Sequence, residues 1–113
     1  MNIQVIGTKK CQDTKKALRF FKERRLEIHF VDLNERTLSA GELRNILQRI
    51  SPEDLMDREG KQFQKRGLQY MKFDIEEELL EDSLLIKTPI VRSKNMAVAG
   101  YKPEEWESLI ESS

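Results

Sequence analysis

The residues best suited to chemistry lie in the stretch 7-GTKKCQDTKKA-17, which holds the only cysteine of the chain. A cysteine just before a helix faces the positive end of the helix dipole, which favours the nucleophilic thiolate. Lys9 and Lys10 precede Cys11 and add positive charge if they lie near the sulfur in space. Thr14 can cap the helix or donate its hydroxyl toward the sulfur. The pattern permits a reactive thiolate, and it equally permits a small buried side chain among solvated lysines.

A second feature is Thr88-Pro89, which lies at the start of a predicted strand. Proline at such a position is most often found at a sheet edge or a strand entrance. Only about 5–6% of X-Pro bonds are cis in folded proteins. In the topology expected below, however, a cis-proline here would lie beside the loop that carries Cys11.

Hydrophobic patterns predict the elements that must position these residues. Residues 2–6 are rich in β-branched side chains and end at Gly7, as a short strand does. Residues 14–25 have helical spacing of apolar side chains, and residues 26–31 alternate like a strand. The remaining predicted elements are helices at about 40–50, 59–66 and 74–80, strands at 87–91 and 96–99, and a last helix from Pro103.

This order predicts an α/β protein with a thioredoxin-like fold. A β-α-β start and a β-β-α finish form a mixed four-stranded sheet, and the helical block at about 39–82 is an insertion. The first two strands should be parallel with a right-handed crossover, and the final hairpin antiparallel. We expect residues 1–113 to form one domain, because 113 residues fit a single core.

Composition restricts the classes of function. The chain has 20 basic and 20 acidic residues, so its formal net charge is zero. This balance gives no electrostatic reason to expect binding to nucleic acid or to a membrane surface. One cysteine excludes an intramolecular disulfide and a cysteine zinc cluster, and one histidine leaves little for a metal site. We therefore expect a cytoplasmic protein with a reduced thiol, no metal and no membrane span.

The charged segments are interpreted as surface. The acidic run 76-EEELLEDS-83 predicts a solvated helix face, with Leu79, Leu80 and Leu84 directed inward. His29 is expected on a strand surface, and Trp106 is expected to anchor the last helix to the sheet. Four basic residues could form an anion-binding surface, although solvated charge is the commoner outcome: Arg58, Lys61, Lys65 and Arg66.

Four motifs in order resemble the arsenate reductase-like (ArsC/Spx) family, closest to its thiol reductase branch. They are GTKKC followed by KKA, 55-LMDREGKQFQKRGL-68, 85-LIKTPIV-91 and 100-GYKPEEW-106. They are spread from residue 7 to residue 106, and the resemblance covers nearly the whole chain. The resemblance implies the thioredoxin-like fold and a nucleophilic role for Cys11. It also implies that no cofactor is bound and that glutathione is the co-substrate.

The true arsenate reductases of the family that this chain resembles bind oxyanions with three arginines. This sequence departs from that pattern. Asp57, Thr88 and Lys102 align with those arginines, and lysine cannot reproduce the bidentate fork of arginine. Arg58 lies next to the first position, and Arg92 follows the third strand. True arsenate reductases also have a histidine four residues before the cysteine, and this sequence has Gly7 at that position.

Two functions follow from the resemblance. The first is a glutathione-dependent thiol/disulfide or oxyanion reductase that uses Cys11 and takes electrons from glutathione or a glutaredoxin/thioredoxin-type reductant. Its substrate site would comprise Lys9, Lys10, Thr14, Arg58, Thr88, Pro89, Arg92 and Lys102. The alternative is an Spx-type redox-responsive transcriptional regulator that binds RNA polymerase. Thr14 stands where some of these regulators have a second cysteine, and a disulfide switch within the chain is impossible because the chain has only one cysteine.

Overall fold

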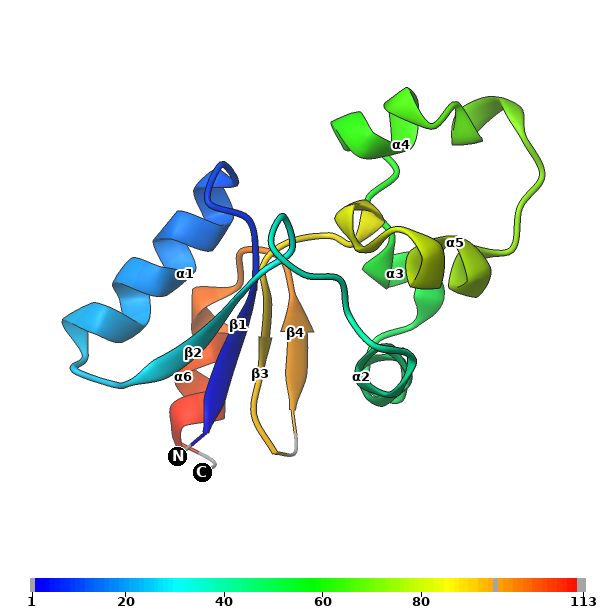
Figure 1. Cartoon of the computed structure of the whole chain (residues 1–113). Coiled ribbons are helices and arrows are strands. Elements are labelled where there is room, and N and C mark those ends of the chain that lie inside the picture. Colours follow the sequence, from blue (N-terminus) through cyan, green and yellow to red (C-terminus); the bar gives the residue numbers. More distant parts are fainter. Residues whose placement is uncertain (1, 95, 112–113) are drawn as a thin grey trace. The chain divides into compact units, whose positions relative to one another are not determined.

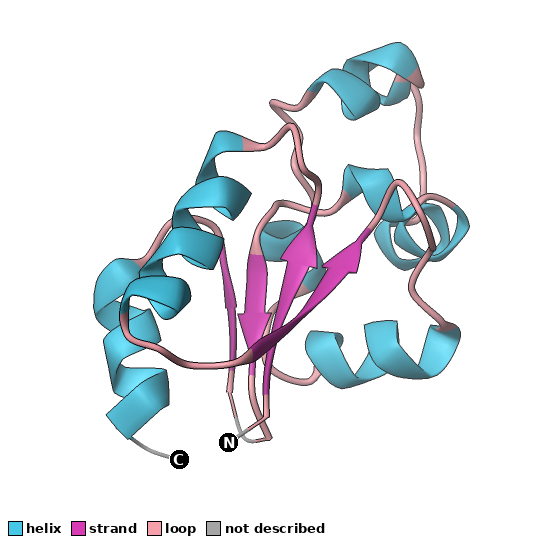
Figure 2. Cartoon of the chain, turned by 60° about the vertical axis from the view of Figure 1, so that its left-hand side comes forward, coloured by secondary structure: helices cyan, strands magenta, loops and turns pink. Residues whose placement is uncertain are grey.

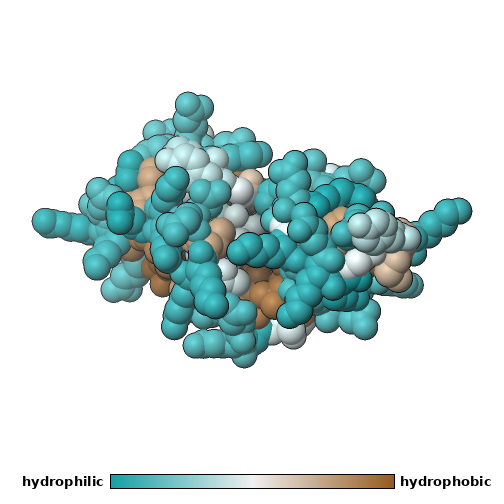
Figure 3. Space-filling view, turned by 90° about the horizontal axis from the view of Figure 1, so that it is seen from above, coloured by the Kyte–Doolittle hydropathy of each residue, from teal (hydrophilic) through white to brown (hydrophobic). Residues whose placement is uncertain are grey.

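The computed structural model describes residues 2–94 and 96–111, which fall into two compact units. The sheet unit comprises residues 1–36 and 88–113, and the helical unit comprises residues 37–87. Both are visible in Figure 1. The helical block predicted at 39–82 lies within the helical unit. Most of the surface in Figure 3 is formed by hydrophilic residues, with apolar residues in small patches.

The sheet unit contains one mixed four-stranded sheet (Figure 2). Its strands are β1 (Ile3–Gly7), β2 (Ile28–Asp32), β3 (Ile90–Arg92) and β4 (Ala97–Ala99), in the order β2-β1-β3-β4. β1 is parallel to β2, β3 is antiparallel to β1, and β4 is antiparallel to β3. This topology confirms the predicted α/β, thioredoxin-like fold.

Two helices, α1 (Gln12–Glu23) and α6 (Pro103–Glu111), pack on one face of this sheet. The core between them is made of fully or almost fully buried side chains: Ile3, Val5, Ala17, Phe21, Val91, Trp106 and Leu109. The ring centroid of Trp106 lies 5.2 Å from that of Phe20 in an edge-to-face arrangement. Trp106 therefore anchors the last helix, as predicted.

Three elements of the sheet unit begin two or three residues away from their predicted starts. α1 begins at Gln12, two residues before the predicted start, because Cys11 occupies the N-cap position. β2 begins at Ile28 rather than at residue 26, after a turn in which Arg25 has a positive φ of 57°. β3 begins at Ile90 rather than at residue 87, since the Lys87 N–H donates instead to the Leu55 carbonyl at 2.7 Å.

The helical unit contains α2 (Ala40–Leu47), α3 (Pro52–Leu55), α4 (Lys61–Lys65) and α5 (Ile75–Glu81), with 3₁₀ turns η1 (Leu68–Tyr70) and η2 (Ser83–Leu85). The predicted capping box of α2 is confirmed: the Ser39 hydroxyl accepts from the Glu42 N–H, and the Glu42 carboxylate accepts from the Ser39 N–H. An isolated antiparallel bridge between Met56 and Ile86 joins the residue after α3 to the last part of the unit.

The prediction for the acidic run was wrong at two of its three leucines. Leu79 is buried, but Leu80 is 48% exposed and Leu84 is 36% exposed. α5 ends at Glu81, and the chain then turns into η2, where the Asp82 carboxylate accepts from the Leu84 N–H. The turn directs the fully buried Leu85 inward in place of Leu84.

Candidate functional site

Cys11 caps the N-terminus of α1. Its N–H donates to the Thr8 carbonyl at 3.2 Å, which closes the turn between β1 and α1, and its own carbonyl accepts from the Lys15 N–H at 3.1 Å. The sulfur therefore stands at the end of the helix where the first-turn N–H groups have no partner within the helix. The side chain is part-buried, which leaves the sulfur a route to solvent.

Thr88 forms a polar wall beside the sulfur. Its hydroxyl donates to Cys11 Sγ at 3.1 Å, and its carbonyl oxygen lies 3.8 Å from the same sulfur, where a thiol proton can reach it. The Thr88–Pro89 peptide bond is cis, which confirms the prediction of a cis-proline beside the cysteine loop. The carbonyl of Pro89 accepts from the Gly100 N–H at 2.8 Å and so ties this wall to the end of β4.

Thr14 lies on the inner side of α1, three residues after Cys11. Its side chain is fully buried, and its hydroxyl has no formed hydrogen bond among the residues that the structure describes. The Thr14 hydroxyl is nonetheless one of the groups that lower the pKa of Cys11.

The surroundings lower the pKa of the Cys11 thiol from its ordinary value. Burial is the largest single influence and raises the pKa, because it disfavours the charged form. The hydroxyls of Thr14 and Thr88, followed by the N–H groups of Thr14 and Asp13, lower it and together outweigh burial. No lysine is among these causes, so hydrogen-bond donors rather than nearby charges favour the thiolate.

The basic residues predicted for the sheet unit lie on its surface or make other contacts. Lys9 is 3.9 Å from a Glu35 carboxylate oxygen, and both side chains are largely exposed. Lys10 and Lys102 are exposed as well. The Arg92 Nε–H donates to Gln4 Oε1 at 2.5 Å.

Arg92 lies at the level of Gln4 in the sheet, as the register shows. Gln4 precedes Gly7, the end of β1 that leads to Cys11, by three residues, or about 10 Å along a strand. Arg92 borders a hollow of about 480 Å³ together with Gln4 and His29. His29 is on the strand surface, as predicted, with Nδ1 3.4 Å from the Gln4 side-chain nitrogen.

Arg58 and Arg66 belong to the helical unit and have separate roles there. The guanidinium of Arg58 lies over two aromatic rings, 5.4 Å from the Phe73 centroid and 5.9 Å from that of Phe63. Its side chain is exposed. Arg58 thus keeps its charge accessible on an aromatic support.

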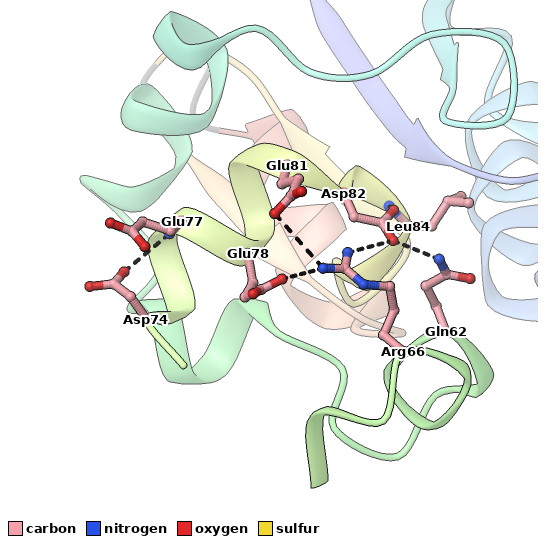
Figure 4. Close-up of polar contacts among 8 residues, drawn as sticks. All are labelled: Gln62, Arg66, Asp74, Glu77, Glu78, Glu81, Asp82 and Leu84. Atoms are coloured by element: carbon pink, nitrogen blue, oxygen red, sulfur yellow. Dashed lines mark hydrogen bonds and ion pairs between the residues drawn. The ribbon is translucent and has the colours of Figure 1, made fainter. Parts of the chain in front are cut away.

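Arg66 is committed to carboxylates, as Figure 4 shows. Its guanidinium contacts Glu78 at 2.5 Å, Asp82 at 3.1 Å and Glu81 at 3.8 Å. Asp82 also accepts from the Gln62 amide at 2.6 Å. The hydrogen bond to Asp82 raises the pKa of Arg66. A residue considered for an anion surface therefore holds α4 against α5, an interaction the sequence pattern did not indicate.

Residues 2–94 and 96–111 contain no group of three or more His, Cys, Asp or Glu residues that could hold a metal ion. Within the same ranges, no helix is both long and apolar enough to cross a membrane.

Comparison with known proteins identifies the family. The model of the ArsC family matches residues 6–109, which include Cys11, Thr14 and Thr88. The chain belongs to the ArsC family. No curated protein matches the chain.

Solved structures agree with this assignment. A YffB protein has a TM-score of 0.83 at 22% identity, with 95% of this chain and 97% of that chain covered. An arsenate reductase from Vibrio cholerae has a TM-score of 0.81 at 18% identity, covering 96% and 98%. An arsenate reductase (ArsC) related protein from Brucella melitensis has a TM-score of 0.70 at 23% identity, covering 98% and 96%. At these identities the likeness shows a shared fold.

Proposed function

We propose that this ArsC family protein is a glutathione-dependent reductase in which Cys11 is the only nucleophile. The observation that carries the proposal is the Cys11 sulfur at the N-cap of α1, flanked by the hydroxyls of Thr88 and Thr14 and with a lowered pKa. A lowered pKa increases the thiolate fraction near neutral pH, and the thiolate is the attacking species.

A disulfide fits this site better than an oxyanion. Thr88, which aligns with one of the oxyanion arginines, turns its hydroxyl to the sulfur at 3.1 Å. Lys102 offers a point charge in place of a bidentate fork. The disulfide bond itself is uncharged and needs no such clamp at the reacting sulfurs, whereas arsenate needs cations for its negative charge.

The substrate in the proposed reaction is a mixed disulfide between a thiol and glutathione. The Cys11 thiolate attacks the glutathione sulfur, the substrate leaves as a thiolate, and a Cys11–glutathione disulfide forms. A second glutathione, as thiolate, attacks this disulfide, releases the Cys11 thiolate and yields oxidised glutathione. The mixed disulfide and one glutathione thiolate thus give the substrate thiolate and oxidised glutathione, so the substrate sulfur is reduced while the incoming glutathione sulfur is oxidised. A glutaredoxin- or thioredoxin-type thiol could replace the second glutathione, and the reducing cytoplasm supplies both.

Mass spectrometry after incubation with oxidised glutathione tests the first covalent step. We expect one glutathione per chain on Cys11, removed by reduced glutathione, and no adduct on Cys11→Ser. Thr88→Val keeps the size of the side chain but removes the donor, so its alkylation rate near pH 7 should fall about 2- to 10-fold, the effect of one net hydrogen bond. A wild-type thiol that reacts like free cysteine across pH, and forms no adduct, would refute the proposal.

An Spx-type regulator that binds RNA polymerase is the second candidate. The observation in its favour is the exposed Leu80, which borders a hollow of about 330 Å³ with Leu43 and Leu47 in the helical unit. Purified RNA polymerase should then bind the wild type but bind Leu80→Ser more weakly. Tyr70→Ser, which alters another exposed apolar residue of the same unit, is the control. Equal binding of all three proteins, or no binding, would count against this candidate.

A further inference from the structure

Gly100 lies where β4 ends and the chain turns toward α6. It has a positive φ of 87°, a conformation that glycine adopts readily and that a side chain disfavours. The register of the β3–β4 hairpin places Gly100 opposite Pro89, one pair beyond Ile90 and Ala99. Its N–H donates to the Pro89 carbonyl at 2.8 Å. Because proline has no N–H, this is the one backbone hydrogen bond that the two residues can form with each other.

Pro89 connects this hydrogen bond to Thr88. The peptide group between Thr88 and Pro89 is planar, and the proline ring fixes φ. The Pro89 carbonyl carbon therefore keeps a nearly constant position relative to the Thr88 carbonyl group. Thr88 in turn contacts the sulfur: its hydroxyl donates to Cys11 Sγ at 3.1 Å, and its carbonyl oxygen lies 3.8 Å from the same atom. A displacement of the Pro89 carbonyl would thus move the groups of Thr88 that contact the sulfur.

From these contacts we infer that Gly100 is a positioning residue for the Cys11 thiol: its N–H holds Pro89, and through Pro89 it keeps the Thr88 hydroxyl on the sulfur. The inference rests on the proposed function, since it concerns the same thiol. Gly100 has no side chain to offer to a substrate, so its contribution passes through Thr88. The effects of changing Gly100 and Thr88 should therefore not be additive.

Alanine at position 100 should weaken the hydrogen bond to Pro89. A Cβ atom disfavours the positive φ of Gly100, so the backbone should rotate toward a negative φ. The chain after Gly100 cannot easily follow this rotation, because the fully buried side chains of Trp106 and Leu109 hold α6 in the core. The peptide group before position 100, which carries the N–H, should then take up the rotation.

The test is a double-mutant cycle of wild type, Gly100→Ala, Thr88→Val and Gly100→Ala/Thr88→Val. The readout is the alkylation rate of Cys11 across pH, which gives the thiol pKa without any substrate. Gly100→Ala should raise the pKa and slow alkylation near pH 7 by at least about 2-fold, but by no more than Thr88→Val does. In the Thr88→Val background it should add little, because no hydroxyl remains to be displaced.

Gly67→Ala is the matched control. Gly67 also has a positive φ, of 68°, but it belongs to the helical unit. Alanine there carries a similar backbone cost without any connection to Thr88, so Gly67→Ala should keep the wild-type alkylation profile. This comparison separates a positioning role of Gly100 from a general loss of stability.

Three results would overturn the inference. The first is a folded Gly100→Ala with the wild-type thiol pKa, and the second is a Gly100→Ala effect as large in the Thr88→Val background as in the wild type. If Gly100→Ala does not fold in buffer, all the proteins are compared in concentrated sucrose, which favours the folded state. A Gly100→Ala that stays unfolded there, while Gly67→Ala folds, is the third result. Absence of reductase activity in the wild type would count against the proposed function and would leave the pKa comparison intact.

Discussion

Replacing Thr14 with valine should increase the free energy of unfolding and should raise the pKa of the Cys11 thiol. The Thr14 side chain is fully buried, and its hydroxyl has no formed hydrogen bond within residues 2–94 and 96–111. Valine has nearly the same shape and a similar helix propensity, so the change substitutes a methyl group for a buried hydroxyl without opening a cavity. Folding then no longer removes an unpaired hydroxyl from water.

The expected gain follows from the degree of burial. A buried polar group without a partner costs about 1–3 kcal/mol. The contact with the sulfur offsets part of this cost, so we expect Thr14→Val to gain about 1 kcal/mol in free energy of unfolding at low pH. For a domain of this size, that gain corresponds to an increase in Tm of roughly 3–6 °C.

The gain should depend on pH because the pKa of Cys11 is lowered in the folded state. Because the pKa of Cys11 is lower in the folded state than in the unfolded state, ionisation of the thiol stabilises the folded wild type. This contribution is complete above the unfolded-state pKa and is lost as pH falls through the folded-state pKa. Thr14→Val loses much of that contribution, since one of the donors to the thiolate is gone. Its advantage over the wild type should therefore be largest at low pH and should shrink as pH rises toward the ordinary cysteine pKa of about 8.5.

Urea unfolding in the presence of a phosphine reductant, at about pH 5.5 and about pH 8.5, measures both effects. Thr14→Ser, which keeps the hydroxyl, is the matched control and should lack the stability gain. Our interpretation fails if valine destabilises the protein at the lower pH. It also fails if the difference from wild type is the same at both pH values.

Two further predictions concern the helical unit and can be checked by urea unfolding. Arg66→Met should cost about 2 kcal/mol, between the values for exposed and buried ion pairs, because Glu78 and Asp82 are mostly buried. Lys65→Met on the same helix should change stability by less than about 0.5 kcal/mol; equal costs for both variants would contradict the role of the Arg66 contacts. Gly67 has a φ of +68°, and among residues 2–94 and 96–111, its two chain neighbours aside, no atom lies within 4 Å of an added Cβ. Gly67→Ala should therefore cost about 1 kcal/mol from backbone conformation alone, and Gly67→Asn clearly less; a larger loss for asparagine would show that space matters.

The sequence predicted the fold well because the sheet unit follows local patterns. Strands of alternating apolar residues, the loop holding Cys11 and the proline before β3 are all readable from neighbouring residues. The sequence predicted the position of Thr14 less well. Threonine is a preferred N-cap and cysteine is not, so the helix was expected to begin at Thr14, whereas Cys11 holds the cap and Thr14 turns inward.

Local sequence patterns could not predict contacts between residues that are distant in the sequence. The pairs of Arg66 with Glu78 and Asp82 span a loop and a 3₁₀ turn, and nothing in the spacing of these residues indicates them. The close approach of Gly7 to Thr14, where an added Cβ would overlap the threonine hydroxyl oxygen, depends on how β1 packs against α1. The sequence showed the glycine but could not show this packing.

Thr88 offers the Cys11 sulfur a hydroxyl donor at 3.1 Å and a carbonyl acceptor at 3.8 Å. A protonated sulfur can direct its hydrogen to the carbonyl, and an ionised sulfur can accept from the hydroxyl. Gain or loss of the proton therefore requires only that hydrogens reorient, while the heavy atoms stay in place. In the proposed reaction, the attacking and resting forms of the thiol would share one scaffold, so little reorganisation energy would separate them each time the sulfur is released as a leaving group.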